Sequence, residues 1–216
     1  MDIIVARDIL KVNDQLAQAN RAKLDAAGLT AVNVMSSPGA GKTTLLERLA
    51  TELKGKLRFG VIEGDLATAN DAQRLDNLGV PTVQINTGRG CHLDANMVQM
   101  ALENIDLTAL DLLFVENVGN LVCPSSYKLG ERCRLVLLSV PEGDDKVAKY
   151  PPMFTDVDAL VITKADLLPY VDFDVERVKR DFAALSPKAR TFQISARTGD
   201  GMPALGEWLL GMRGSK

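Results

Sequence analysis

Short apolar runs rich in β-branched residues alternate along the chain with longer segments whose apolar residues recur at helical spacing. This alternation is typical of a parallel sheet whose strands are joined by crossover helices. Two runs, 112–115 and 135–140, are apolar at almost every position, as expected for central strands covered on both faces. The pattern therefore predicts an α/β fold with a doubly wound, mostly parallel sheet. Its strands are expected near residues 31–36, 58–64, 82–87, 112–118, 134–140, 159–163 and 190–195.

The N-terminal segment, from about Ile3 to Ala27, predicts a leading helix that stops at Gly28. We expect this helix, within residues 1–28, to dock on the core of a single domain spanning residues 1–216. The chain is long enough for one substantial core, and it contains no internal repeat or low-complexity linker. The apolar positions at helical spacing in this segment include Ile9, Val12, Leu16, Ala19 and Leu24.

A glycine-rich segment, S-S-P-G-A-G-K-T, lies between the first predicted strand and a helical pattern, which is the context that a phosphate-binding loop requires. Backbone N–H groups around Gly39 and Gly41 would face the phosphates of a nucleoside triphosphate. Lys42 would reach the β- and γ-phosphates, and the Thr43 hydroxyl would bind Mg²⁺. The usual pattern has a glycine where this chain has Ser36, so that position must accommodate a Cβ. The expected nucleotide-binding residues here are Ser37, Pro38, Gly39, Ala40, Gly41, Lys42, Thr43 and Thr44.

The segment from Thr163 to Asp166 follows the sixth predicted strand and matches the [NT]-K-x-D pattern with which GTP-binding proteins read the base. The Asp166 carboxylate can accept hydrogen bonds from both N1–H and the exocyclic amine of guanine, whereas adenine presents an acceptor at N1. Lys164 would lay its methylene groups along the base plane. After the last predicted strand, Ser195 and Ala196 begin a segment similar to S-A-K, whose backbone N–H contacts guanine O6. These motifs together favour GTP over ATP.

Two predicted strands end in acidic residues suited to the magnesium side of the site. Asp65 is the preferred ligand, because a carboxylate at a strand end is needed to hold Mg²⁺ or its waters opposite Thr43. Glu116 is the expected sensor of the γ-phosphate or of metal-bound water, next to Gly119, which is expected to approach the nucleotide. Asp71 is an alternative ligand, although a solvated charge on a helix face is the simpler interpretation. The candidate catalytic residues are Lys42, Asp65 and Glu116.

The only histidine of the chain is adjacent to a cysteine in Cys91-His92, and Cys123 follows the fourth predicted strand. Both loops follow strands, so both are expected on the ligand side of the sheet, where thiolates and imidazole can meet. This predicts a Ni²⁺ or Zn²⁺ site with three protein ligands, completed by an exogenous ligand or a second protomer. The spacing alone leaves an alternative in which the three residues have ordinary structural positions. Cys133, which precedes a buried strand, is expected in the core.

The composition argues against several classes of partner. A net charge of -3 and 25 basic residues spread without a dominant cluster provide no footprint for nucleic acid or an anionic membrane. The longest apolar runs are too short to span a bilayer, and the first residues lack the order of a signal peptide, so a cytoplasmic protein is expected. Three cysteines in a reducing compartment do not indicate a disulfide framework.

Taken together, these motifs resemble the HypB family, the GTPases of hydrogenase nickel incorporation, over nearly the whole chain. The matching segments are Ser37–Thr44, Glu63–Thr68, Asn70–Ala72, Cys91–Ala95, Glu116–Pro124, Glu142–Lys146 and Lys149–Pro151. The resemblance implies a P-loop NTPase of the SIMIBI class that binds GTP and GDP with Mg²⁺, hydrolyses GTP and dimerises on nucleotide binding. It also implies a nickel or zinc site at Cys91, His92 and Cys123 on the dimer interface. The implied partners are a small zinc-containing nickel chaperone and the hydrogenase large subunit.

Two departures from family patterns narrow the prediction. Residues 1–30 contain no Cys or His, so nickel storage by a Cys-rich or His-rich N-terminal motif is not supported. Cys91-His92 also lacks the intervening proline of the Cys-Pro-His motif in the urease-maturation relative. Two alternatives stay open, namely a maturation GTPase for another metalloenzyme (urease or a cobalamin-dependent mutase) and a small-molecule P-loop kinase. Lys146 and Lys149 are candidates to act across a dimer, although two solvated lysines on a helix are the simpler interpretation.

Overall fold

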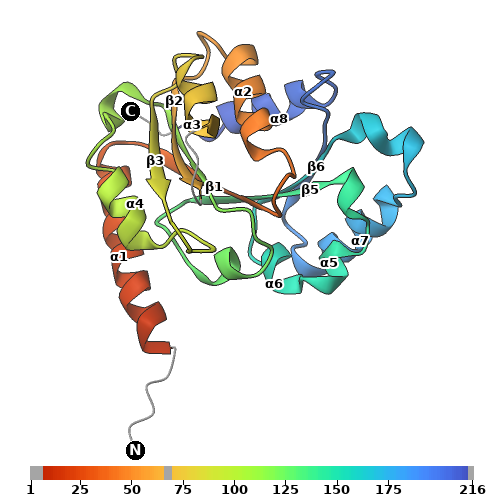
Figure 1. Ribbon diagram of the computed structural model, residues 1–216, viewed down its shortest axis with the longest axis horizontal. Coiled ribbons are helices and arrows are strands. Elements are labelled where there is room, and N and C mark those ends of the chain that lie inside the picture. The colour runs from red at the N-terminus through yellow and green to blue at the C-terminus, as the bar shows by residue number, and fades with distance from the viewer. Residues whose placement is uncertain (1–6, 66–69, 214–216) are drawn as a thin grey trace, which may run out of the picture.

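The computed structural model describes residues 7–65 and 70–213. Within these ranges, seven strands form one sheet in the order β3-β2-β4-β1-β5-β6-β7, and every neighbouring pair is parallel (Figure 1). The strands are β1 (Thr30–Ser36), β2 (Phe59–Asp65), β3 (Thr82–Asn86), β4 (Leu112–Glu116), β5 (Cys133–Ser139), β6 (Ala159–Thr163) and β7 (Arg190–Gln193). All seven predicted strands are confirmed, and their ends differ from the predicted ends by at most two residues.

Helices cover both faces of the sheet, which confirms the doubly wound prediction. Helices α2, α3 and α8 pack on one face, and α1, α4, α5, α6 and α7 pack on the other (Figure 1). In the part of the chain that the structure describes, every helix is too short or too polar to cross a membrane. The helices are α1 (Arg7–Ala26), α2 (Lys42–Glu52), α3 (Asn70–Asp76), α4 (Ala95–Ala101), α5 (Lys146–Lys149), α6 (Pro151–Phe154), α7 (Val175–Leu185) and α8 (Met202–Leu210). The short 3₁₀ turns are η1 (Leu107–Ala109), η2 (Cys123–Ser126), η3 (Val140–Glu142) and η4 (Ala165–Tyr170).

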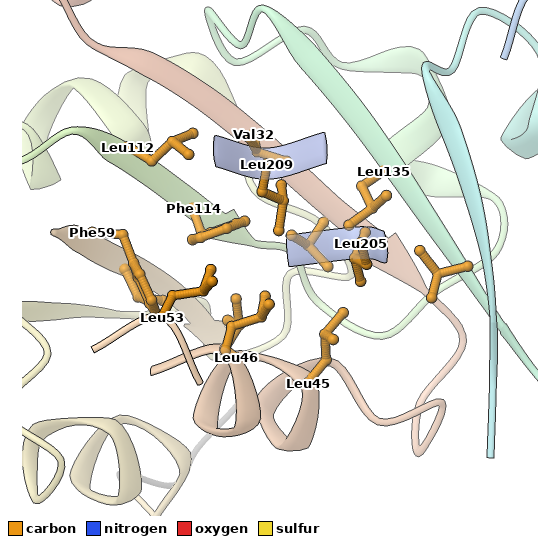
Figure 2. Close-up of a cluster of buried hydrophobic side chains, with 14 of the residues drawn as sticks. Val32, Leu45, Leu46, Leu53, Phe59, Leu112, Phe114, Leu135, Leu205 and Leu209 are labelled. Atoms are coloured by element: carbon orange, nitrogen blue, oxygen red, sulfur yellow. The ribbon is translucent and has the colours of Figure 1, made fainter. Parts of the chain in front are cut away.

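Alternate residues of the central strands face opposite layers of the core. On β4, Leu112 and Phe114 lie under α2 and α8, whereas Leu113 faces α1 and α4. Figure 2 shows the first of these layers, in which Leu46 of α2 and Leu205 of α8 point toward the sheet around Phe114. Because both faces are buried, the strand needs apolar residues at every position. This packing fixes α2, and with it the loop that precedes α2, on the sheet.

The docking face of α1 differs from the prediction. Leu24 is buried as expected, but Val12 is 58% exposed and Ala19 is also exposed. Residues 3–6 and the side chain of Ile9 lie outside the described residues. The helix ends at Ala26, and Gly28 beyond it has a φ of +64°, as expected of a helix stop. Among the described side chains of α1, those that are buried belong to Asn13, Ala17, Asn20 and Leu24.

Two asparagine side chains provide much of the contact between α1 and the rest of the protein. Asn20 Nδ2 donates to the carbonyls of Ala95 at 2.8 Å and Leu129 at 3.0 Å. Asn13 Nδ2 donates to the carbonyl of Lys128 at 2.8 Å, and its Oδ1 accepts from the N–H of Ala95 at 2.9 Å. Buried amides bonded in this way are compatible with a core position. A search for apolar periodicity could not find these contacts, because the two side chains that make them are polar.

Candidate functional site

The phosphate loop lies between β1 and α2. Gly39 and Gly41 have φ values of +73° and +96°, a conformation that residues with a Cβ rarely adopt. Gly41 immediately precedes α2 and Lys42 begins it, so the helix N-terminus faces the loop. Ser36 ends β1 without a positive φ, so its Cβ causes no backbone strain. Its hydroxyl accepts from Nζ of Lys42 at 3.3 Å, and the serine at the usual glycine position therefore helps to hold the lysine.

Side chains from other loops hold the backbone of the phosphate loop. Thr163 Oγ1 donates to the carbonyl of Ala40, and Lys164 Nζ donates to the carbonyl of Gly39, each at 2.7 Å. The Ser37 hydroxyl donates to the carboxylate of Glu142, at the end of η3. Thr163 and Lys164 belong to the predicted base-reading motif, so the base side and the phosphate side of the site are directly connected.

A cavity of about 280 Å³ lies between the phosphate loop and the ends of β6 and β7. It brings together the predicted residues Thr44, Lys164, Asp166, Ser195 and Ala196. Ser195 Oγ donates to Asp166 Oδ1 at 2.7 Å, which orients the carboxylate. The lining also includes Arg197, the third residue of the segment similar to S-A-K, and Leu167, which the sequence motifs did not single out. The cavity has the position and the donor and acceptor groups expected of a guanine site.

A second cavity, of about 220 Å³, lies at the carboxyl ends of β2 and β4. The predicted residues that line it are Pro38, Gly39, Lys42, Asp65, Asp71, Glu116 and Gly119. Glu63 also lines it and is the register partner of Glu116 on the neighbouring strand. Thr43 Oγ1 donates to Glu116 Oε1 at 2.8 Å. Asp71 pairs with Arg74 at 2.9 Å while it lines the cavity, so its carboxylate faces both a helix neighbour and the site.

Burial gives the carboxylates of this cavity unusual electrostatics. Glu63 and Glu116 are 2% and 4% exposed, and Oε2 of each is buried without a hydrogen-bond partner among the described residues. Burial, together with the carboxylates of Glu116, Asp65 and Asp71, raises the pKa of Glu63 to about 8. Burial also raises the pKa of Glu116 to about 7, against the opposing charge of Lys42. A cation that prefers oxygen ligands would relieve this repulsion, so the residues present fit Mg²⁺.

The three predicted soft ligands lie together. Sγ of Cys91 is 2.8 Å from Sγ of Cys123 and 3.5 Å from Nδ1 of His92. One ligand atom from each residue lies within 4.8 Å of the others, so a single ion can contact all three. Burial lowers the pKa of His92, which favours the neutral imidazole that binds metals. The ring stacks on Tyr127, a residue not predicted from the sequence, with centroids 3.9 Å apart.

Cys91, His92 and Cys123, here called the thiol cluster, come together because the loop after β3 crosses the end of β2. Cys91 and His92 lie between β3 and α4, whereas Cys123 begins η2 after β4. Strands β3 and β4 are not neighbours, because β2 lies between them. The loop can cross the end of β2 because Gly64 has no side chain; a Cβ there would lie 2.7 Å from Cγ of Leu93. The spacing of Cys91, His92 and Cys123 in the sequence did not reveal this crossing.

Two thiolates and an imidazole suit Ni²⁺ or Zn²⁺, which bind sulfur and nitrogen ligands. Three ligands leave at least one position for a group from outside this cluster. Both cysteines of the cluster are free thiols. Cys133 is 3% exposed in β5, which confirms its predicted place in the core, and burial raises its pKa. The alternative in which Cys91 and Cys123 occupy unrelated structural positions is therefore not supported.

Known proteins share this combination of fold and motifs. The family model of the CobW/HypB/UreG nucleotide-binding domain matches residues 30–193. The hydrogenase maturation factor HypB of Rhizobium leguminosarum bv. viciae is 48% identical over 96% of this chain and 69% of its own length. This chain belongs to the HypB family. It is therefore a GTPase, and membership in the family argues against the small-molecule kinase alternative.

Two crystal structures of HypB proteins agree with the fold of this chain. HypB from Helicobacter pylori in complex with nickel has a TM-score of 0.89 at 47% identity, covering 92% of this chain and 94% of that one. HypB from Archaeoglobus fulgidus has a TM-score of 0.87 at 39% identity, covering 94% and 98%. These similarities confirm the predicted fold class, a P-loop NTPase of the SIMIBI class. Of the HypB motifs in this chain, Leu66–Thr68 and the side chain of Asn70 lie outside the described residues.

Proposed function

We propose that this chain uses GTP binding and hydrolysis to control the binding and release of nickel during hydrogenase maturation. The observation that carries the proposal is the short connection between the two sites. Strand β4 ends at Glu116, in the acidic cavity, and the loop that follows reaches Cys123, in the thiol cluster, seven residues after Glu116. A change at the γ-phosphate position would therefore act on a metal ligand. The nickel complex of Helicobacter pylori HypB and the names of the maturation-factor relatives support this function.

On the nucleotide side, we propose that the loop N–H groups and Lys42 hold the phosphates, and that Thr43 and Asp65 bind Mg²⁺. Glu116 orients Thr43 through their hydrogen bond and faces the γ-phosphate position. A magnesium ion held by these residues would neutralise charge on the phosphates. Intrinsic hydrolysis is expected to be slow, on the order of 10⁻⁴ to 10⁻² s⁻¹, unless a partner supplies positive charge. This rate suits a switch better than a metabolic enzyme.

We propose that two GTP-bound protomers meet at the thiol cluster, because three ligands from one chain leave the coordination of an ion incomplete. The proposed partners in nickel delivery are a small zinc-containing nickel chaperone and the hydrogenase large subunit, in the cytoplasm. Lys146 and Lys149 stay candidates to act across the dimer. Both pair with Asp145 of their own chain, so they would have to exchange that partner for a phosphate.

Nickel titration in two nucleotide states tests the proposed function. Nickel is expected to bind more tightly with a non-hydrolysable GTP analogue than with GDP, by roughly 5- to 150-fold for a typical coupling. Linkage requires nickel to raise the preference for the GTP analogue over GDP by the same factor. Because the proposed site is shared by two protomers, nickel should also tighten the dimer, which light scattering at several protein concentrations measures. Equal nickel affinity in both states, or a dimer unaffected by nickel, would contradict the proposed coupling.

Replacing Asp166 with asparagine is expected to weaken GTP by about 10- to 150-fold, the effect of losing a charged hydrogen bond worth about 1.5–3 kcal/mol. Xanthosine triphosphate should gain affinity, because the amide can donate to the 2-oxo group of xanthine where the carboxylate is repelled. Competition binding with both nucleotides measures the exchange. Asp172→Asn, at an exposed position, is the matched control and should change neither affinity. If GTP affinity holds and xanthosine triphosphate gains nothing, Asp166 does not read the base.

A further inference from the structure

The segment after β4 is packed directly against the phosphate loop. Gly119 approaches the loop so closely that a Cβ would lie 2.7 Å from Cα of Pro38. Packed backbones of this kind move together, because no space separates them. Asn117 and Asn120 lie on either side of Gly119. Asn117 bonds to Leu93, the residue after the Cys91-His92 pair, and Asn120 bonds to Cys123.

The side chain of Asn117 joins three segments. Its Oδ1 accepts from the backbone N–H groups of Leu93 and Val118, each at 3.0 Å, and its Nδ2 donates to Oδ1 of Asn33 at 3.3 Å. Leu93 directly follows the Cys-His pair, and Asn33 lies in β1, the strand that leads into the phosphate loop. Asn117 and Asn33 are fully buried, so water does not compete for these bonds. The hydrogen bonds of Asn117 therefore connect β1 to the loop that carries Cys91 and His92.

Asn120 forms a second connection, from β1 to the loop that carries Cys123. Its backbone N–H donates to the carbonyl of Ser36, the last residue of β1, at 2.8 Å. Its Oδ1 accepts from the N–H groups of Val122 at 2.7 Å and Cys123 at 3.1 Å, and its Nδ2 donates to Sγ of Cys123 at 3.7 Å. One residue thus bonds to the edge of the phosphate loop with its backbone and to a metal ligand with its side chain.

We infer that Asn117 and Asn120 are positioning residues that set the separation of the two thiols according to the state of the phosphate loop. The inference rests on the proposed function. Both connections begin on β1, and they end on different loops, one at Leu93 and the other at Cys123. Movement of the segment after β4 together with the phosphate loop therefore displaces the two sulfur atoms separately. An ion is bound well only in the nucleotide state that brings both sulfur atoms to the same centre.

Asn120 provides the sharper test, because its side chain is only half-buried and its backbone bond to Ser36 survives substitution. In Asn120→Ala, the ratio of nickel affinities with the GTP analogue and with GDP is expected to fall from the wild-type 5- to 150-fold to near one. GTP affinity should stay within about twofold. Sulfur-to-nickel charge-transfer absorption should also lose its dependence on nucleotide, which a merely structural role would not cause.

Asn120→Ser is the conservative variant. A serine hydroxyl can accept from a nearby backbone N–H, more weakly than asparagine, but it is too short to donate to Sγ of Cys123. Its affinity ratio is therefore expected to lie between one and the wild-type value. Asn104→Ala removes an exposed asparagine that bonds to the carbonyl of Met100, away from both sites, and should leave the ratio unchanged.

The outcomes separate the inference from the proposed function. A wild-type ratio that persists in Asn120→Ala overturns the inference alone. A wild-type protein that binds nickel equally in both nucleotide states contradicts the proposed control of nickel by GTP, and the inference fails with it. A wild-type protein that does not bind nickel overturns the proposed function and the inference with it. If Asn120→Ala is too unstable to purify, Asn120→Ser decides, and an unchanged ratio in that variant overturns the inference.

Discussion

Lys42→Ala is expected to abolish GTP hydrolysis and to weaken Mg·GTP binding by roughly 30- to 5,000-fold, which corresponds to about 2–5 kcal/mol for truncating one partner of a buried charge pair. Among the described residues that line the acidic cavity, Lys42 is the only cation. It is also 8% exposed, so water cannot replace it. Because Lys42 lowers the pKa of both Glu63 and Glu116, its loss also favours protonated carboxylates, which bind Mg²⁺ poorly. Isothermal titration and phosphate release measure the two effects.

The fold should survive the change, because the apolar side chains that seat α2 on the sheet lie farther along the helix, at Leu45, Leu46 and Leu49. Lys54→Ala is the matched control, since Lys54 is exposed just beyond the end of α2. Its nucleotide affinity and thermal stability should match those of the wild type. Unchanged GTP affinity in Lys42→Ala would contradict the assignment of the phosphate loop.

The features that were predictable from the sequence depend on local physics. The strands were located by apolar runs, because a strand covered on both faces needs an apolar residue at each position. The phosphate loop was located because glycine is required where φ is positive, as at Gly39 and Gly41. Even the replacement of the usual glycine by Ser36 has a local reason. Ser36 ends β1 without a positive φ, so a residue with a Cβ fits there.

The features that were missed depend on which segments become neighbours. Glu63 joins Glu116 because β2 pairs with β4, although β3 follows β2 in the chain. Nothing in the local pattern at Glu63 indicates that it shares a buried cavity with Glu116. The docking face of α1 was missed for the same reason, because it depends on segments distant in sequence. The backbone partners of Asn20 lie 75 and 109 residues away.

The thiol cluster was predictable in part from the sequence. The adjacency of Cys91 and His92 was visible in the sequence, and the position of each loop after a strand correctly placed both on the ligand side. The contact with Cys123 needed Gly64, whose missing side chain lets the loop cross β2. The amide links of Asn117 could not be predicted either, because the hydrogen bonds from Leu93 and to Asn33 exist only once three separate segments have packed.

Replacing both Cys91 and Cys123 with serine is expected to remove nickel binding while GTP still binds. The two sulfur atoms are 2.8 Å apart, so both contribute to the same site, and His92 alone would hold the ion weakly. Loss of residues that only support metal ligands typically costs 10- to 100-fold in metal affinity, so loss of two ligands should exceed roughly 100-fold. Competition against a chromophoric chelator measures the nickel affinity, and titration with a non-hydrolysable GTP analogue measures nucleotide binding.

Cys133→Ala is the matched control, because it removes a thiol from the core and not from the cluster. It should retain nickel and lose only about 1 kcal/mol of unfolding free energy, the effect of deleting one buried heavy atom. The single variant Cys123→Ala separates binding from coupling. It keeps Cys91 and His92 but removes the ligand on the loop after β4, which the proposal connects to the γ-phosphate position. Any residual nickel affinity should therefore no longer depend on nucleotide. Nickel retained by the double variant would place the site elsewhere, and nucleotide-dependent affinity in Cys123→Ala would show that coupling does not pass through this thiol.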